Sequence, residues 1–405
     1  MNTPHPSWNT FESRIDRSNG HVIQSLLDTD TYKLTMQQVF FKKFPDVKAS
    51  YRFKCRNTDV NLLEFKDEIS DEIEYLCSLQ FKPNELEWLR KIRFMSSGFI
   101  DFLEDFKLKK RFIHVGEKAG KLDIVTDGSL IQASAFEIYV LKIVHEVYTR
   151  NVNPTVDLAW ARETLYNKIK LIEEFIRDEE IIPDIADFGG RRAFTGLWHE
   201  EVVKILSDNN IIKGTSNPLL AMLYGLTPIG TFAHEFVQTF QGIGNCPVAN
   251  SQKEAFQTWQ DVYRGDLGIA LSDTLGDDKF LKDFDMYFAK LFDGLRHDSG
   301  DPIKWGWKMI KHYKSMKIDP MTKVLVFSDG LDIPTALNIL LVFKDQIKVS
   351  FGIGTNLTND CGPKALQNVM KQTYCNGNPT AKLSNNPAKT MCEDSNFINY
   401  LRSVI

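Results

Sequence analysis

The spacing of hydrophobic and polar residues changes near residue 150. Before that point, residues 49–56 alternate as in a half-buried strand, whereas residues 83–92 and 134–147 show helical spacing. This mixture predicts an N-terminal α/β domain over residues 21–150. Residues 1–20 are polar and interrupted by prolines, so we expect a frayed leader, with order beginning near Val22.

After residue 150, short runs of apolar or small residues repeatedly end in a Gly, Ser, Thr or Asp loop, and a helix-length segment usually follows. The seven runs cover residues 185–189, 211–216, 228–231, 268–273, 294–296, 324–329 and 347–352. Strands that alternate with helices predict a parallel sheet. Seven such units, with polar residues at the same end of each, favour a closed α/β barrel over residues 151–358. The loop-rich residues 359–405 are assigned to the N-terminal domain or to a small appended lobe.

The composition removes several functions from consideration. The chain has 405 residues, of which 25% are charged and 43% hydrophobic, and its formal net charge of −4 gives no attraction to nucleic acid or anionic membranes. No apolar run reaches the length of a membrane span, and the first twenty residues lack the apolar core of a signal peptide. The six cysteines form no CxxC pair, which predicts reduced thiols in a cytoplasmic protein.

Polar residues that end parallel strands converge on the C-terminal mouth of a barrel, where barrel enzymes build their sites. The densest polar group covers residues 294–302. Arg296 can bind a carboxylate or phosphate, Asp298 can bind sugar hydroxyls or Mg²⁺, and Ser299 precedes a glycine that permits close backbone approach. This combination favours chemistry on a phosphorylated sugar.

Glycines end the last predicted strand. Gly352, Gly354 and Thr355 lie in a turn whose backbone N–H groups can cradle a phosphate. The alternative is an ordinary β-to-α turn, because Leu357 breaks the full GxGxxG pattern.

Three aspartates, Asp273, Asp298 and Asp329, lie near the ends of predicted strands. A single aspartate in such a place is most often a helix N-cap. Three that converge on one mouth would instead chelate Mg²⁺ or accept hydrogen bonds from a ribose, so Asp273 and Asp329 are candidate metal ligands.

His234 lies where a predicted strand gives way to a helix. A lone histidine is usually satisfied within the core. At a barrel mouth it is a candidate nucleophile or proton carrier, with Glu235 or another carboxylate to orient it. The zinc-protease pattern HExxH is excluded, because residue 238 is Gln238.

Two further groups have simple explanations. Residues 28–33 are best explained as an acidic cap on the first helix. Arg56, Lys382 and Lys389 are solvated surface charges unless the fold brings them to the mouth.

The motifs together resemble those of the nicotinate phosphoribosyltransferase family. The resemblance covers nearly the whole chain after the leader, in family order, and rests on residues 25–33, 187–192, 214–217, 228–235, 295–302, 351–355 and 382–389. It implies an irregular parallel α/β barrel of the type II phosphoribosyltransferase kind, plus an α/β sandwich domain built from both chain ends. It also implies a homodimer with shared active sites, in which Tyr32 and Arg56 act across the interface.

The reaction that the resemblance implies belongs to NAD salvage. Nicotinate and phosphoribosyl pyrophosphate yield nicotinate mononucleotide and pyrophosphate, and ATP hydrolysis is coupled to this transfer through a phosphohistidine at His234. The implied cofactors are ATP and Mg²⁺, and the implied catalytic residues are His234, Asp298 and Arg296.

The family motifs also assign binding roles. Phe188 and Tyr32 would sandwich the pyridine ring, and Arg296 with Arg191 would clamp the nicotinate carboxylate. Asp298 would hold the ribose hydroxyls. The remaining implied contacts are Ser299 and Thr231 to substrate, Gly352, Gly354 and Thr355 to the 5′-phosphate, and Arg56, Lys382 and Lys389 to pyrophosphate.

Two positions depart from the family pattern, since Gly190 and Ala193 stand where the family commonly has Thr and Arg. The loss of one cation is expected to weaken substrate affinity or ATP coupling. Two alternatives stay open. The same fold acting on nicotinamide is disfavoured by the two arginines at the carboxylate, and a catalytically silent nucleotide-binding barrel is disfavoured by the intact His234 and Asp298.

Overall fold

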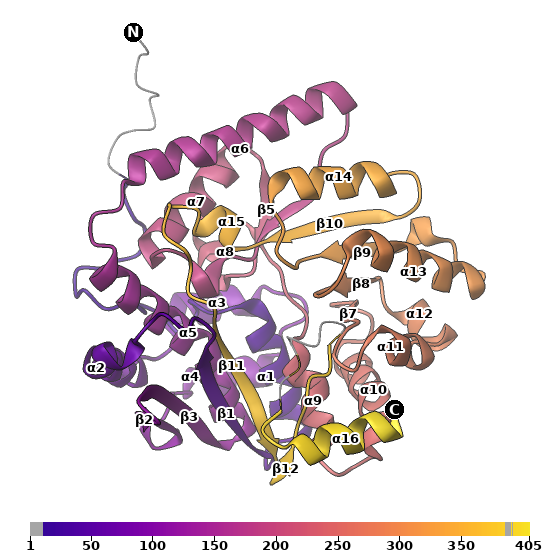
Figure 1. The fold of residues 1–405 in the computed structure, drawn as a ribbon, viewed down its shortest axis with the longest axis horizontal. Coiled ribbons are helices and arrows are strands. Elements are labelled where there is room, and N and C mark those ends of the chain that lie inside the picture. Colours follow the sequence, from indigo (N-terminus) through magenta and orange to yellow (C-terminus); the bar gives the residue numbers. More distant parts are fainter. Residues whose placement is uncertain (1–10, 385–389, 391) are drawn as a thin grey trace.

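Two sheets organise the part of the chain that the computed structural model describes, which is residues 11–384, 390 and 392–405 (Figure 1). Within these residues, the larger sheet has seven parallel strands in the order β6-β5-β4-β10-β9-β8-β7. The strands are β4 (Ile185–Asp187), β5 (Ile212–Thr215), β6 (Thr227–Pro228), β7 (Ile269–Leu271), β8 (Gly294–His297), β9 (Val324–Phe327) and β10 (Lys348–Ile353). Each overlaps one of the seven predicted runs, so the predicted parallel α/β core is confirmed.

The larger sheet curls, but its backbone ladder does not close over the described ranges, because β6 and β7 remain as edges. Strand β6 is only two residues long, and its Pro228 has no N–H to donate. Thr231 instead bridges the gap, donating from Oγ1 to the backbone oxygen of Ile269 (3.0 Å). The expected closed barrel is therefore an irregular, partly open one.

Helices connect successive strands and surround the curled sheet (Figure 1). They are α6 (Leu158–Glu179), α7 (Gly196–Asp208), α8 (Pro218–Tyr224), α9 (His234–Gly242), α10 (Ser251–Tyr263), α11 (Asp277–Asp283), α12 (Met286–Leu291), α13 (Pro302–Ser315), α14 (Ile333–Phe343) and α15 (Thr355–Thr358). Short polar residues fix where several of them begin. Asn217 accepts from two backbone N–H groups of α8, and Asp301 accepts from two of α13. Among the described helices, none is long and apolar enough to cross a membrane.

The smaller sheet is antiparallel and joins both ends of the chain. Its strand order over the described residues is β12-β11-β1-β3-β2. The strands are β1 (Lys48–Cys55), β2 (Ile113–Lys118), β3 (Lys121–Ser129), β11 (Asn368–Cys375) and β12 (Asn378–Pro379). Because β11 lies directly beside β1, the expectation of a domain built from both chain ends is confirmed. The boundaries at residues 150 and 358 stay predictions.

Helix α5 holds the two sheets together. The helices that accompany the smaller sheet are α1 (Thr31–Lys43), α2 (Lys66–Ser78), α3 (Pro83–Arg90), α4 (Ser97–Glu104), α5 (Leu130–Val152) and α16 (Ser395–Val404). Most residues of α5 are buried. It contacts α1, β1, β3 and β11, and also the turn Gly190–Arg192 that follows β4 of the larger sheet.

The predicted leader is ordered earlier than we expected. Ser13 Oγ donates to Glu200 of α7 (2.6 Å), and the backbone N–H of Arg14 donates to the same carboxylate (2.7 Å). The expectation that order begins near Val22 is therefore wrong, because Ser13 and Arg14 help to satisfy the buried Glu200, to which Tyr224 also donates. Residues 1–10 of the leader lie outside the described residues.

Candidate active site

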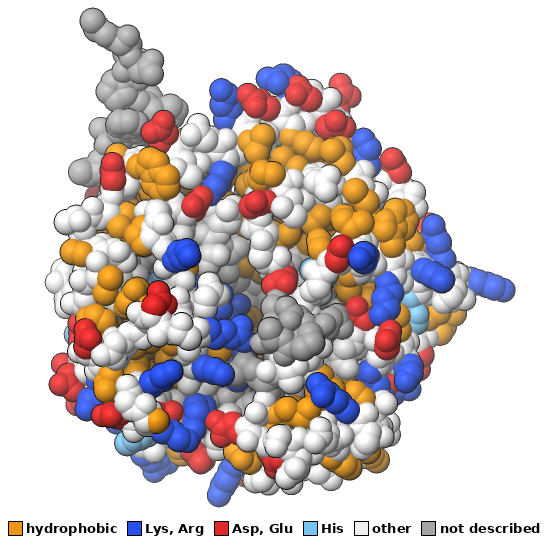
Figure 2. Space-filling model, in the orientation of Figure 1, with side chains coloured by type: hydrophobic (Ala, Val, Ile, Leu, Met, Phe, Trp, Pro, Cys, Tyr) orange, Lys and Arg blue, Asp and Glu red, His pale blue; other side chains and the backbone are white. Residues whose placement is uncertain are grey.

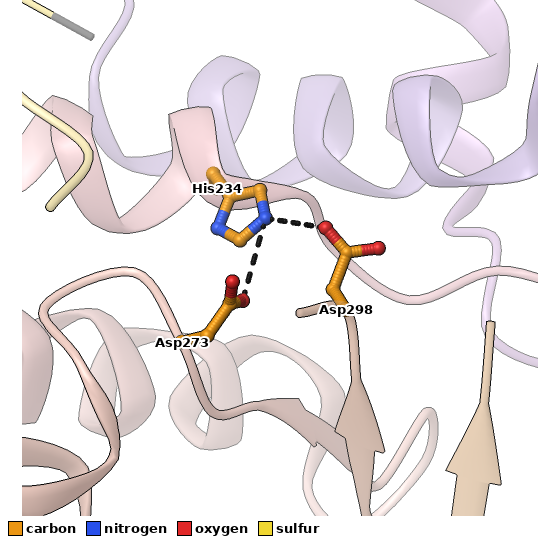
Figure 3. Close-up of side chains that lie close together, drawn as sticks. All are labelled: His234, Asp273 and Asp298. Carbon is orange, nitrogen blue, oxygen red and sulfur yellow. Dashed lines mark hydrogen bonds and ion pairs between the residues drawn. The ribbon is translucent and has the colours of Figure 1, made fainter. Parts of the chain in front are cut away.

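His234 lies at the centre of a buried cluster at the C-terminal ends of β7 and β8 (Figure 3). Its Nε2 atom is 2.8 Å from Oδ2 of Asp298 and 3.5 Å from Oδ1 of Asp273. Asp273 follows β7 and Asp298 follows β8, and adjacent parallel strands deliver their C-terminal residues to one edge. The structure therefore brings together three of the residues singled out from the sequence.

Lys382 supplies positive charge to this cluster. Its Nζ atom is 2.7 Å from Nε2 of His234, 3.1 Å from Oδ2 of Asp273 and 3.6 Å from Oδ2 of Asp298. Lys382 is buried, so the explanation as a solvated surface charge is wrong for this residue. Ser299 adds a hydrogen bond from its Oγ to Oδ2 of Asp273 (2.6 Å).

Thr274 holds the other side of the imidazole. Its buried hydroxyl is 3.0 Å from Nδ1 of His234. Burial, and secondly the Lys382 ammonium, lower the pKa of His234 to about 4, although Asp273 and Asp298 act in the opposite direction. The imidazole is therefore neutral near pH 7 and retains a lone pair for nucleophilic attack.

Glu235 does not orient His234, contrary to one expectation from the sequence. It forms an ion pair with the buried Lys33 of α1, which is also 2.6 Å from Glu137 of α5. Adjacent residues of a helix point in different directions, so Glu235 faces the core while His234 faces the cluster. The carboxylates that contact His234 come from strand ends instead.

The carboxylates of this cluster are partly neutralised within the protein. One donor atom from each of His234, Asp273 and Asp298 lies within 4.8 Å of the other two, which is a spacing that metals can use. The Lys382 ammonium contacts all three side chains and supplies one positive charge against the two carboxylates, so a magnesium ion held here by the protein stays a prediction. Asp329, the other predicted ligand, lies after β9, and its charge acts on His297.

Glycines place the predicted aromatic residue beside the predicted phosphate turn. Phe188 follows β4 and donates its backbone N–H to the oxygen of Ile353 in β10 (2.9 Å). A Cβ at Gly352 would lie 2.3 Å from the Phe188 ring, and a Cβ at Gly354 would lie 3.3 Å from the Phe188 backbone oxygen. Only glycine fits at residue 352 with the ring in this position. Thr355 follows directly and begins α15.

Tyr32 lies near Arg191, one of the two arginines that the resemblance assigned to the nicotinate carboxylate. It lies half-buried in the first turn of α1, where the preceding Thr31 N–H donates to the oxygen of Ser216 beyond β5 (2.7 Å). Burial would lower the pKa of Arg191, but the charges of Tyr32 and Asp30 outweigh it and raise that pKa. The expectation that Tyr32 acts across a subunit interface stays a prediction.

Asp30 does not cap the first helix, contrary to the explanation suggested by the sequence. It precedes α1, but its side chain caps no N–H of that helix. Its carboxylate instead accepts from Ser216 Oγ (2.9 Å) and lies 3.9 Å from Nε of Arg191. The acidic residues before α1 therefore tie this helix to the larger sheet.

The guanidinium of Arg296, in β8, has an N–H donor that makes no hydrogen bond to a described residue. Its Nε is buried and has no hydrogen-bond partner among the described residues. Arg296 is also among the charges that hold the pKa of Asp298 well below its usual range, against the effect of burial. A buried guanidinium donor of this kind is suited to a bound carboxylate.

The structure adds cations that no sequence motif indicated. Burial lowers the pKa of Lys371 in β11 to about 8, with Arg191 and Lys382 acting in the same direction and Glu137 against it. Burial, then the charges of Arg191 and Arg56, lower the pKa of Arg192 to about 10. Figure 2 shows Lys and Arg side chains gathered at the centre of this face. Like charges repel, so such a group is stabilised when an anion binds.

Not every predicted residue can be placed. Lys389 lies outside the described residues. Thr231 lies beside the site, but its hydroxyl bridges the two edges of the larger sheet. Thr274 and Lys371 were missed because a single Thr or Lys forms no recognisable motif. Their only signal was position, after a predicted strand for Thr274 and in a strand-like run for Lys371.

A neutral buried histidine, a glycine turn at a strand end and a group of cations together define an enzyme site for phosphorylated substrates. Comparison with known proteins makes this specific. The model of the nicotinate phosphoribosyltransferase (NAPRTase) family matches residues 184–405, and that of the NAPRTase N-terminal domain matches residues 27–145. The chain therefore belongs to the nicotinate phosphoribosyltransferase family.

Relatives and solved structures agree over nearly the full length. A nicotinate phosphoribosyltransferase of Acinetobacter baumannii is 48% identical over 396 residues, covering 95% of this chain and 97% of the relative. One of Burkholderia cenocepacia is 50% identical over 388 residues, covering 95% and 96%. The crystal structure of nicotinate phosphoribosyltransferase from Vibrio cholerae is similar with a TM-score of 0.91 at 34% identity, covering 95% of this chain and 94% of that one.

Proposed function

We propose that this chain forms nicotinate mononucleotide and pyrophosphate from nicotinate and phosphoribosyl pyrophosphate in NAD salvage, and couples this transfer to ATP hydrolysis through a phosphohistidine at His234. Family membership supports the transfer reaction. The coupling rests on one observation: Nε2 of a neutral histidine lies against Lys382, beside a group of cations suited to phosphates.

In the phosphoryl step, Thr274 accepts a hydrogen bond from Nδ1–H of His234, which puts the lone pair on Nε2, the nitrogen that faces Lys382 and Asp298. This lone pair attacks the γ-phosphorus of ATP. The bond between that phosphorus and the bridging oxygen breaks, and ADP leaves with the electron pair. Lys382 stabilises the charge on the transferred phosphoryl oxygens. Mg²⁺ enters as the complex with the phosphates of ATP and phosphoribosyl pyrophosphate, as part of the substrates.

In the glycosyl step, the pyridine nitrogen bonds to C1 of the ribose as the bond from C1 to pyrophosphate breaks, through an oxocarbenium-like state. The nitrogen brings its own lone pair, so no protein base is needed. Asp298 accepts hydrogen bonds from the ribose hydroxyls, and the turn at Gly354 and Thr355 binds the 5′-phosphate. Lys382 and Arg56 stabilise the leaving pyrophosphate.

Nicotinate is recognised by two aromatic side chains, which hold its ring, and by two arginines, which bind its carboxylate. Phe188 and Tyr32 stack on the pyridine ring, for which offset aromatic contacts are suited. Arg296, with its buried Nε donor, and Arg191 bind the carboxylate. This choice of cations discriminates against nicotinamide, which is neutral. The homodimer expected from the resemblance stays a prediction.

Product identification tests the reaction. The full chain is incubated with phosphoribosyl pyrophosphate, Mg²⁺ and either nicotinate or nicotinamide, with and without ATP. We expect nicotinate mononucleotide, in higher yield with ATP. Product from nicotinamide alone would support the nicotinamide alternative, and no product from either pyridine would support a silent nucleotide-binding barrel.

The phosphohistidine is tested by replacing its acceptor. His234→Ala should abolish incorporation of radioactive phosphate from ATP and the ATP-dependent gain in product, because Nε2 is lost. Some ATP-independent synthesis should remain. His114→Ala, at an exposed histidine of β2, is the matched control and should label normally. Unchanged labelling of His234→Ala would place the acceptor elsewhere.

A further inference from the structure

A cavity lies on the smaller sheet, apart from the histidine cluster. It has a volume of about 530 Å³ and is formed by β1, β3 and β11 together with the segment around Glu393 and Ile398. Among the described residues that line it, none is His234, Asp273, Arg296 or Asp298. Ligand pockets for small molecules typically measure ~300–1,000 Å³, so this cavity is large enough to hold one.

The lining of this cavity is strongly cationic. Its basic residues, within the described part of the chain, are Arg52, Lys54, Lys118, Lys121 and Lys371. Its two acidic residues, Asp123 and Glu393, both face Arg52, at 3.6 and 3.4 Å. The four lysines therefore form no ion pair with any described residue. Figure 2 shows several Lys and Arg side chains on the part of this face that lies over the smaller sheet.

Apolar side chains form part of the same wall. Val60, Leu62, Leu122 and Ile398 line the cavity, and Leu62 and Leu122 are buried. Asn57, Asn61 and Thr373 add hydrogen-bonding groups beside them. A wall that is apolar in one part and cationic in another matches a ligand with a ring system and phosphates. A metal ion or a purely apolar ligand would leave one of the two parts unused.

We propose that this cavity is a second ligand site that binds a nucleotide, with its phosphates toward Lys371 and Lys121 and its nucleoside against Val60, Leu122 and Ile398. The site goes beyond the proposed reaction and does not depend on it. Its phosphate end lies toward the active site, because Lys371 is within electrostatic range of Lys382 and Arg191.

The cavity also has a direct contact with the helix that carries His234. Gln372 lines the cavity, and its side chain donates to Thr239 Oγ1 of α9 (2.9 Å). A nucleotide bound here therefore touches a residue that is hydrogen-bonded to the catalytic helix.

Photolabelling of the full chain with 8-azido-ADP, without nicotinate or phosphoribosyl pyrophosphate, tests the proposal. We expect label on peptides that contain residues 52–62 or 118–123, removed by excess ADP. Val60→Trp fills the cavity and Lys121→Glu reverses a charge, and each should reduce this label about tenfold. Lys311→Glu, at an exposed lysine of α13, should label as the wild type does.

Each outcome separates the explanations. Label confined to peptides near His234, or label on the cavity that both variants retain, would overturn the proposal. Competition by pyrophosphate as strong as by ADP would reduce the site to one for anions and would also overturn it. If Val60→Trp fails to fold, Lys121→Glu decides, because its side chain is exposed. Labelling requires no turnover, so an inactive chain that labels at the cavity contradicts only the proposed reaction.

Discussion

In the proposed phosphoryl step, the hydroxyl of Thr274 is the contact that selects which imidazole nitrogen of His234 reacts. At 3.0 Å from Nδ1, it fixes the ring and leaves Nε2 toward Lys382 and the carboxylates. Removing it frees the ring to adopt the other tautomer, which has no lone pair at Nε2.

Thr274→Val should therefore slow formation of phosphohistidine about tenfold, the effect of roughly 1.4 kcal/mol from one lost hydrogen bond. ATP-independent synthesis should change little. A single-turnover experiment with labelled ATP and alkaline quenching measures the rate. Thr274→Ser retains the hydroxyl and should restore the rate; an undiminished rate in Thr274→Val would show that the contact does not select the nitrogen.

The protonation of His234 has a characteristic pH range. Its pKa is lowered from 6.5 to about 4, so the neutral, nucleophilic form should persist as the pH falls through 6.5 and be lost only near pH 4. The unfolded chain takes up this proton near pH 6.5, so the contribution of His234 to stability is present above pH 6.5 and is lost as the pH falls from there toward 4. NMR titration of the imidazole, assigned with His234→Gln, measures this pKa. A midpoint near 6.5 would contradict the enclosed, neutral ring.

Arg296 is expected to determine pyridine specificity. Arg296→Ala should weaken nicotinate recognition by about 2–5 kcal/mol, as when one partner of a buried charge pair is removed. Arg296→Lys keeps the charge but loses the paired donors, so it should recover only part of the loss. The kcat/KM values for nicotinate and nicotinamide measure the effect. A normal KM for nicotinate in Arg296→Ala would contradict the clamp.

At the scale of elements, the contact between β10 and the end of β4 positions the aromatic side of the site. Gly352→Ala would place a Cβ 2.3 Å from the Phe188 ring and force that ring to move. We expect the KM for nicotinate to rise about tenfold and stability to fall by about 1–3 kcal/mol from overpacking. Gly98→Ala, where no atom lies within 4 Å of the new Cβ, is the control. Equal nicotinate KM values in both variants would remove Phe188 from the binding site.

The elements were predictable where their patterns are local. Each strand of the larger sheet is a short apolar run that ends in a turn former, and these runs could be counted without the structure. The pairing of β11 with β1 could not be found in this way, because it joins residues more than 300 positions apart and neither strand marks its partner. The open edge at β6 depends on Pro228 and on a strand of two residues, which is too short for any periodicity.

The site residues were also predictable only where a local pattern or the polarity of the strands placed them. Convergence of Asp273, Asp298 and His234 followed from the common polarity of parallel strands. The error over Glu235 came from treating a neighbour in sequence as a neighbour in space. Lys382 could be assigned only through the family motif, since a lysine in a loop-rich segment carries no information about its partner 148 residues away.

At the scale of the whole molecule, the question is whether one chain holds a complete site. The family resemblance implies that one subunit completes the site of the other, with Tyr32 acting across the interface. Mixing Tyr32→Ala with His234→Ala should therefore restore ATP-dependent formation of nicotinate mononucleotide toward one quarter of the wild-type level. No recovery would show instead that each chain holds a complete site.

The placement of β11 sets the order in which this protein matures on the ribosome. The smaller sheet begins with residues 48–55, yet its central pairing waits for residues 368–375, more than 300 positions later. Until then β1 presents an unsatisfied edge that can attract other nascent chains. Lys382 emerges later still, so a polypeptide cut short after the larger sheet has neither the pairing of β1 with β11 nor the ammonium beside His234. Synthesis must pass residue 382 before the proposed chemistry can start.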